Sequence, residues 1–223
     1  MQDTTKKRFG FIAAFAVYFV ALWMLWYTPI IFPLKVFVVM LQEISHGLVT
    51  LVTGGTIESI VVTPAEGGLC KCAGGNAFLT LSAGYLGSLA WGALIFWAAV
   101  RKGAWSRGMT AAIGIFLLGV SLMFVRNPFG LGFGLLFGAG LVMSARYLGV
   151  ATNGAILMVL GLTSVLYAIL DIKSDVLDRP NLPSDARMLS ELTAIPTVVW
   201  GVMWIGIALL VAWWLLRWAY RRI

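Results

Sequence analysis

The sequence predicts an all-α polytopic membrane protein of about six or seven transmembrane helices, with a small β-hairpin after the second helix. Hydrophobic residues make up 61% of the chain and charged residues 11%, against about 25% charged in an ordinary soluble domain. Several apolar stretches reach the roughly 18 residues that can cross a bilayer. Basic residues stand in small groups beside these stretches, as at 6–8, 101–102 and 221–222, where they anchor helix ends at the membrane surface. The net charge of +7 is therefore assigned to contact with the lipid bilayer, and nucleic acid is excluded as a partner.

The first two spans are expected near the start of a single membrane domain, 1–223. A basic tail precedes the apolar run 10–32, which is too long for the core of a signal peptide and lacks a small-residue cleavage site. We expect a retained helix that ends at Pro33. The second span is expected at 34–53, where two glycines, 54–55, end it.

A β-hairpin is predicted after the second span. Two short runs rich in β-branched residues, 56–63 and 69–72, flank a Pro/Gly turn at 64–68. The hairpin is too polar to face lipid, so it must pair internally or lie at the interface. Cys70 and Cys72 lie two residues apart and share one face of a strand. We expect this geometry to disfavour a mutual disulfide, leaving small packed residues or, as the alternative, a thiolate beside a metal.

The remaining spans follow from apolar runs separated by short polar segments. A polar loop, 172–195, precedes the last span, and Ser184 is a plausible N-cap for a short helix at 185–193. Two units result: 34–100 holds the second span, the hairpin and the third span, and 150–220 holds the sixth span, the polar loop and the last span. Seven alternating spans put the ends of the second and sixth spans on the side of the N-terminus, together with the hairpin, and the two chain ends on opposite sides. The later spans are expected at 77–100, 109–125, 129–145, 150–170 and 196–220.

The second span carries a polar motif. Residues 42–46 read Gln-Glu-Ile-Ser-His, which, apart from Gln42, is the H-E-x-x-H signature of zinc metalloproteases. In that signature two imidazoles on one helix face bind a metal, and the glutamate between them acts on a bound water. Charged groups inside a membrane helix are costly and usually functional. His46 is the chain's single histidine, so no other imidazole can replace the one absent at position 42. The structural alternative is that Gln42, Glu43 and His46 cross-link helices.

The chain resembles the M50 family of intramembrane zinc metallopeptidases, the site-2 proteases, and most closely its bacterial M50B-like members. The likeness extends from about Leu34 to the C-terminus. It implies an integral protein of the bacterial cytoplasmic membrane that cleaves membrane-embedded protein substrates with Zn²⁺ as its cofactor. It also implies that the hairpin holds an unwound substrate segment by strand addition. The motifs that carry the likeness are Glu-Ile-Ser-His-Gly at 43–47, Thr-Gly-Gly at 53–55, Gly-Gly at 74–75, Ala-Gly-Tyr-Leu-Gly at 83–87 and Leu-Asp at 170–171.

The resemblance also implies roles for individual residues. Glu43 corresponds to the catalytic general base, His46 to the second zinc ligand and Asp171 to the third, with Asp175 as the runner-up. Gln42 stands at the first ligand position, where a neutral amide is a weak zinc ligand beside imidazole. The Asn-Pro that precedes the family's Leu-Asp and the Gly that follows it are also absent here.

We therefore expect a chain that is inactive or impaired as a protease. A natural pseudoenzyme, an unusual set of zinc ligands and an introduced substitution are all compatible with Gln42. The alternative function is a non-catalytic membrane module, either a pseudoprotease scaffold or a transporter in which the buried charges form an ion or proton path.

Overall fold

The computed structural model describes residues 2–101, 104–178 and 183–222. Within them, six helical segments are long and apolar enough to cross a membrane, and an antiparallel two-stranded hairpin follows the first of these. The predicted fold class is confirmed, and the chain is an integral membrane protein. The elements in order are α1 (Gln2–Leu25), α2 (Phe32–Val52), β1 (Thr56–Val62), β2 (Gly68–Ala73), α3 (Ala77–Val100), α4 (Trp105–Phe124), α5 (Pro128–Tyr147), α6 (Val150–Lys173), the π-helical turn η1 (Ser174–Asp178), α7 (Asp185–Thr193) and α8 (Thr197–Tyr220).

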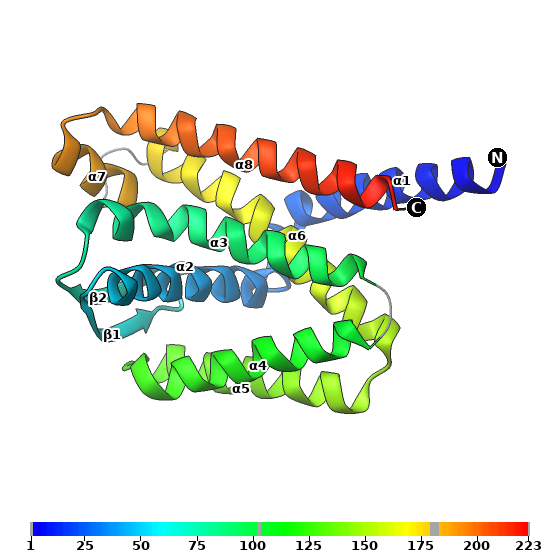
Figure 1. Ribbon diagram of the computed structural model, residues 1–223, viewed down its shortest axis with the longest axis horizontal. Coiled ribbons are helices and arrows are strands. Elements are labelled where there is room, and N and C mark those ends of the chain that lie inside the picture. The colour runs from blue at the N-terminus through cyan, green and yellow to red at the C-terminus, as the bar shows by residue number, and fades with distance from the viewer. Residues whose placement is uncertain (1, 102–103, 179–182, 223) are drawn as a thin grey trace.

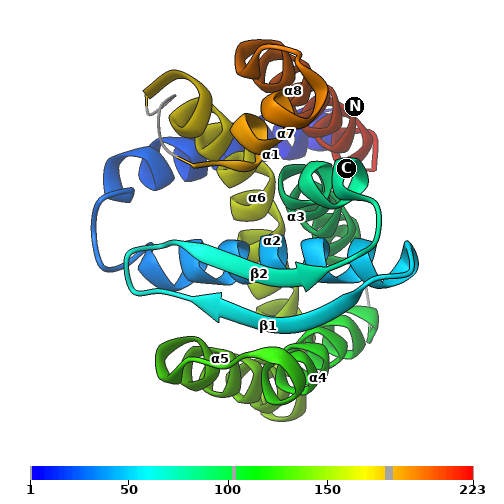
Figure 2. The ribbon, with the colours of Figure 1, turned by 90° about the vertical axis from the view of Figure 1, so that its left-hand side faces the viewer.

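The helices surround α2. Figure 2 shows α3, α6 and α8 on one side of α2, and the hairpin followed by the α4–α5 pair on the other. The hairpin and α7 lie at the same end of the bundle (Figure 1). The prediction that the hairpin and the end of the sixth span share one side is therefore confirmed.

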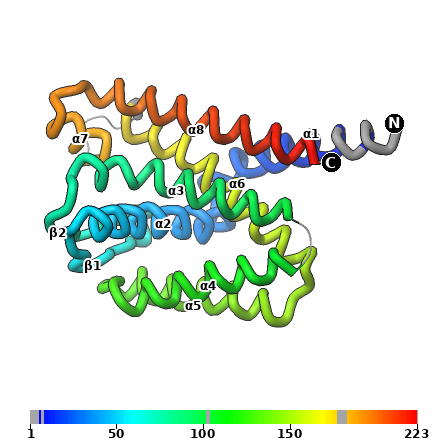
Figure 3. The backbone as a smooth tube through the Cα atoms, viewed as in Figure 1, coloured from blue at the N-terminus to red at the C-terminus, as the bar shows by residue number. Residues whose placement is uncertain are grey.

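The predicted placement of the two chain ends is wrong. The outer ends of α1 and α8 both lie at the end of the bundle opposite the hairpin (Figures 1 and 3). The reason is the course of α1, whose Phe11 packs in the same hydrophobic cluster as Leu215 and Ala219 near the end of α8. Pro33 also does not end a helix: α1 ends at Leu25, and Pro33 lies in the first turn of α2, where its fixed φ and missing N–H fit a helix start.

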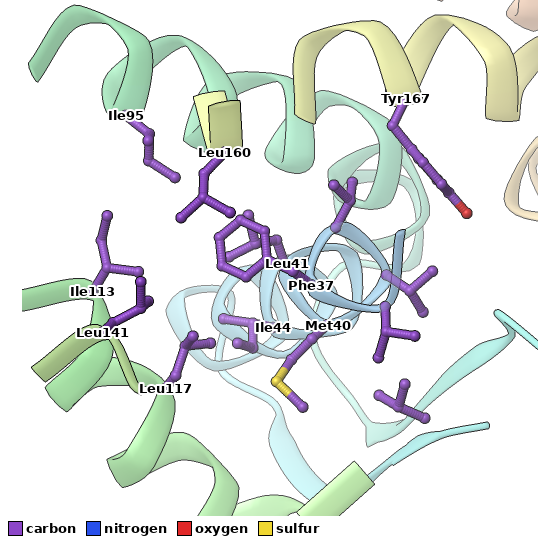
Figure 4. Close-up of a cluster of buried hydrophobic side chains, with 14 of the residues drawn as sticks. Phe37, Met40, Leu41, Ile44, Ile95, Ile113, Leu117, Leu141, Leu160 and Tyr167 are labelled. Atoms are coloured by element: carbon purple, nitrogen blue, oxygen red, sulfur yellow. The ribbon is translucent and has the colours of Figure 1, made fainter. Parts of the chain in front are cut away.

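The core is built on α2. Figure 4 shows Phe37, Met40, Leu41 and Ile44 of α2 packed among side chains of the surrounding helices. These four side chains are at most 2% exposed. Because α2 is enclosed by protein at this level, the polar residues it carries must find partners among neighbouring segments. The partners of the α2 side chains in this cluster include Ile95 of α3, Ile113 and Leu117 of α4, Leu141 of α5 and Leu160 of α6.

Glycines lie where two pairs of helices approach most closely. A Cβ on Gly138 of α5 would lie 2.9 Å from the Gly114 carbonyl oxygen of α4. A Cβ on Gly92 of α3 would lie 2.8 Å from the Ser164 Cβ of α6. Both distances are too short for any larger residue, so these glycines set the separation of the helices.

One edge of the hairpin is closed by the segment that joins α4 and α5. The Arg126 N–H donates to the Ile60 carbonyl of β1 at 3.0 Å. The Asn127 amide donates to the Val62 carbonyl at 2.7 Å and accepts from the Val62 N–H at 3.1 Å. The outer edge of β1 is therefore already paired, which ties the hairpin to the α4–α5 pair.

Cys70 and Cys72 form a disulfide, which corrects the expectation that they would not pair. Their Cα atoms are 5.6 Å apart, within the 4.4–6.8 Å range over which a disulfide can form. The shared strand face that was expected to disfavour the bond brings the two side chains together.

Asn127→Ala should weaken the attachment of β1 to the α4–α5 segment. The change removes both bonds to Val62, and a buried backbone group left without a partner costs about 1–3 kcal/mol. We expect a lower thermal unfolding temperature in detergent and faster hydrogen exchange of the Val62 amide. Asn127→Asp keeps the acceptor for the Val62 N–H, so it should slow that exchange relative to the alanine variant. Equal exchange of Val62 in the native chain and in Asn127→Ala would contradict the assignment.

Candidate functional site

Three polar side chains of α2 lie side by side in an otherwise apolar helix. Gln42 and Glu43 are each 7% exposed and His46 is 8% exposed. Helical spacing places His46 one turn beyond both of the others, so all three reach toward neighbouring elements on adjoining faces. Each has a partner from a different part of the chain.

His46 is held by α3 and α7. Its Nδ1 lies 2.7 Å from the carbonyl oxygen of Thr80 in the first turn of α3, and because a carbonyl can only accept, Nδ1 carries the hydrogen. Its Nε2 lies 3.1 Å from Oδ2 of Asp185, the first residue of α7. The ring is therefore fixed in orientation at both nitrogens.

Gln42 pairs with the predicted third ligand. Its Nε2 donates to Oδ2 of Asp171 at 2.6 Å, so the carboxylate faces amide hydrogens. Asp175 is bonded elsewhere, because the Tyr85 hydroxyl of α3 donates to its Oδ2 at 2.5 Å. The structure thus brings Asp171 to position 42 and not to the His46 ring nitrogens.

Glu43 faces the hairpin. Gly68 of β2 approaches so closely that a Cβ there would lie 2.6 Å from Cγ of Glu43. The backbone N–H of Cys70 is directed at the Glu43 carboxylate, and His46 and Asp185 lie within electrostatic range of it. Glu43 therefore lies between β2 and the His46–Asp185 pair.

Asp185 was missed by the sequence analysis, which treated it only as the start of a short helix. That helix is confirmed: the Ser184 hydroxyl caps α7 by accepting from the Arg187 N–H at 3.3 Å. The signal available in the sequence was an acidic residue at the first position of a capped helix inside a polar loop. Nothing local to that loop indicates that it folds back onto α2.

A family model matches most of the chain. The family model described as Peptidase M50B-like matches residues 15–215. The chain belongs to the Peptidase M50B-like family. No curated protein and no solved structure gave a match.

Zinc is the metal of M50 peptidases in general, so the donor set of this M50B-like chain can be tested against it. A catalytic zinc needs three protein ligands and an open position. Among the described residues, no three histidine, cysteine, aspartate or glutamate side chains are grouped to hold a metal ion. At position 42 the amide hydrogens point at Asp171, and an N–H group cannot bind a cation. As arranged, the donors do not fit a catalytic zinc.

Gly68→Ala should disturb this M50B-like site directly. The added methyl group would overlap the Glu43 carboxylate, and forced overpacking costs about 1–3 kcal/mol. We expect a correspondingly lower unfolding temperature in detergent. Gly67→Ala is the matched control, since its Cβ would meet only the Thr63 hydroxyl, at 3.2 Å, and should change stability by no more than about 0.5 kcal/mol. Equal effects of the two variants would show that β2 does not press on Glu43.

Proposed function

We propose that this chain is an intramembrane-protease homologue that binds an unwound segment of a membrane protein along β2, and that glutamine at position 42 leaves it without efficient zinc-dependent hydrolysis. The hydrogen bond from Gln42 to Asp171 is the observation that carries the second half of this proposal. Family membership and the buried site beside the hairpin support the first half.

The chemistry of position 42 supports a loss of hydrolysis. An imidazole at the first position of the motif offers a lone pair to a metal, whereas the Gln42 amide donates hydrogens to a carboxylate. For Gln42 to act as a ligand it would have to turn its oxygen inward and give up the bond to Asp171. Even then an amide oxygen is a weak zinc ligand beside imidazole.

The hydrogen-bonding pattern of the hairpin supports segment binding on β2. Ile60 and Val62 direct their backbone groups outward, toward 125–127. In an antiparallel pair, two residues directly opposite each other direct their backbone N–H and C=O groups either both toward the partner strand or both away from it. Cys70 and Gly68 lie opposite Ile60 and Val62, so their backbone groups also point away from β1. Those outward groups of β2 lie beside Glu43.

A guest strand on β2 would therefore lie beside the motif glutamate, which already accepts from the Cys70 N–H. In the described parts of the chain, the sheet has two strands and the bridge to Val125 is on β1, so no further strand covers β2. Strand addition gives affinity through main-chain hydrogen bonds and leaves side-chain pockets to select the guest. A membrane helix must unwind to offer such bonds, since its amides are otherwise paired internally.

A cavity of about 740 Å³ extends the proposed binding region. Its walls come from the α1–α2 connection, the hairpin turn and the end of α6, so it joins the turn that precedes β2 to the Asp171 carboxylate. Aromatic walls with a few charged groups suit a bulky apolar side chain of a guest segment. The residues that line it include Trp26, Tyr27, Lys35, Glu66, Tyr167 and Asp171.

Gln42→His should raise zinc content and proteolysis. The purified native chain is expected to retain little zinc and to leave a membrane-embedded substrate uncut. The histidine variant is expected to retain more zinc, measured by elemental analysis, and to cleave the substrate in detergent or liposomes. Adding Glu43→Gln to that variant should abolish cleavage without releasing zinc, because Glu43 is assigned to proton transfer and not to metal binding. Stoichiometric zinc and rapid cleavage by the native chain would refute the proposal.

A photoreactive amino acid at Leu69 should label an unwound membrane segment. Leu69 lies on β2 and is 53% exposed. We expect a synthetic membrane-spanning peptide with Gly and Pro at its centre to be labelled more strongly than one with an uninterrupted leucine core. The same probe at Leu136 on α5, which is 79% exposed, is the control and should not distinguish the peptides. Equal labelling of the two peptides from Leu69 would remove β2 as the binding edge.

A further inference from the structure

A groove of about 550 Å³ lies between the end of α3 and the start of α6, at the end of the bundle opposite the hairpin (Figure 1). Its floor consists of small residues of α6. Ala151, Gly154 and Ala155 follow one another on one face of the helix, and Met158 continues that face. A Cβ on Gly154 would have only the Ala99 carbonyl oxygen within reach, at 4.0 Å. No neighbouring side chain therefore fills this apolar groove above Gly154.

Arg101, the residue that follows α3, lines the same groove and is exposed. The carbon atom of its guanidinium group lies 3.8 Å from the ring centre of Trp97 and 5.9 Å from that of Trp105. In the described parts of the chain no carboxylate pairs with this guanidinium group. Tryptophan beside a basic residue at a helix end is typical of the membrane–water interface. The groove therefore opens at the level of the lipid headgroups.

The charge at this end of the bundle is not balanced by the protein. The described segments around the groove, 95–101, 104–110 and 143–158, contain three arginines and no aspartate or glutamate. Eight of the chain's nine acidic residues lie instead in 43–66 and 171–191, in the parts of the chain that build α2, the hairpin, the end of α6 and α7. Basic pockets between transmembrane helices attract anionic lipid headgroups, so an anion from the membrane is the expected counterion.

The start of α6 adds N–H groups that have no partner within the helix. The first bond of α6 runs from the Asn153 N–H to the Gly149 carbonyl at 3.1 Å, and Gly149 offers no side chain to cap the amides that follow it. Free amides and the positive end of the helix dipole both favour an anion. Val150 and Ala151 line the groove together with Arg101, so the guanidinium group and the helix end border the same space.

We propose that this groove binds one phospholipid with an anionic headgroup. Its phosphate contacts Arg101 and the start of α6, and an acyl chain lies along Ala151, Gly154 and Ala155. A free anion would leave the apolar floor uncovered. A peptide segment would have to place its amides against walls that offer few hydrogen-bonding groups. A phospholipid matches both parts, with a charged group at the headgroup level and hydrocarbon beneath it. The site is separate from β2 and does not depend on the proposed function.

The bound lipid would join α3 to α6. These are the helices that carry Tyr85 and Asp171 of the functional site toward their other ends. A ligand that binds the folded state and not the unfolded state raises the unfolding temperature. We therefore expect the lipid to stabilise the helix pair that supports the site, although it binds at the opposite end of the bundle.

The first test compares two headgroups on the full chain in a neutral detergent. Phosphatidylglycerol and phosphatidylcholine with the same acyl chains are titrated separately, and single-lipid adducts are measured by native mass spectrometry. We expect roughly tenfold tighter binding of phosphatidylglycerol, because the choline cation offsets the charge that Arg101 meets. Arg101→Gln should remove most of this preference.

Arg217→Gln is the matched control for Arg101→Gln. Arg217 also stacks on a tryptophan, with its guanidinium carbon 4.9 Å from the ring centre of Trp213, and it lies near the end of α8 at the same end of the bundle. It does not line the groove. Its replacement makes the same change in net charge and should alter either affinity by less than roughly twofold.

A second variant tests the acyl-chain part of the groove without changing charge. Ala155→Phe places a ring where the hydrocarbon is expected, so it should weaken binding of both lipids and abolish the rise in unfolding temperature that phosphatidylglycerol produces. Phosphatidylglycerol with a photoreactive acyl chain should label Met158 of the groove more strongly than Met143 of α5, which is 59% exposed. Unfolding of the lipid-free variants verifies that each is folded.

Four results would overturn the proposal. They are equal affinity of the native chain for the two lipids, equal effects of Arg101→Gln and Arg217→Gln, unchanged lipid binding by folded Ala155→Phe, and displacement of phosphatidylglycerol by inorganic phosphate. The last result would reveal a site for free anions in which the apolar floor has no part.

Discussion

Pairing of the polar groups on α2 is the constraint on which the rest of the structure depends. Leaving a polar or charged group unpaired in an apolar interior costs several kcal/mol, and α2 passes through the centre of the bundle. Its partners come from the hairpin turn, from β2, from the end of α6 and from the start of α7. The positions of these segments around α2 are therefore set by hydrogen bonds and charge, while apolar packing sets the spacing of the helices. The α2 side chains concerned are Lys35, Gln42, Glu43 and His46.

Features that depend on local sequence patterns could be predicted, whereas features that depend on contacts between distant segments could not. Membrane spans and the hairpin could be predicted because long apolar runs, β-branched residues and Pro/Gly turns act locally. The position of Asp185 beside His46 could not be predicted, because it depends on α7 packing against Trp200 and Trp204 and on the space left at Gly84. The course of α1 was mispredicted for the same reason, since an alternating count of spans contains no information about which helices pack together.

Position 42 supplies a hydrogen-bond donor to the neighbouring Asp171 carboxylate. Asp171 lies next to an amide that supplies its own hydrogens, so its charge is met by a hydrogen bond within the protein. A histidine at that position has a ring nitrogen with a lone pair, which can bind a metal. In this chain position 42 therefore belongs to a polar cluster closed by the protein's own groups, and the proposed loss of hydrolysis depends on that one side chain. Fold and membership of the Peptidase M50B-like family are consequently independent of whether the chain is a hydrolase.

The closed edge of β1 also limits how many further strands can pair with the hairpin. Residues 125–127 occupy the side of the sheet on which a second copy of the hairpin could otherwise add, so the sheet cannot grow in both directions. Exposed strand edges are sites of uncontrolled association, and a sheet that can be extended on one side only stops after a single addition. The closed edge of β1 therefore limits the binding proposed for β2 to one extended chain at a time, and it protects the hairpin from edge-to-edge polymerisation in a crowded membrane.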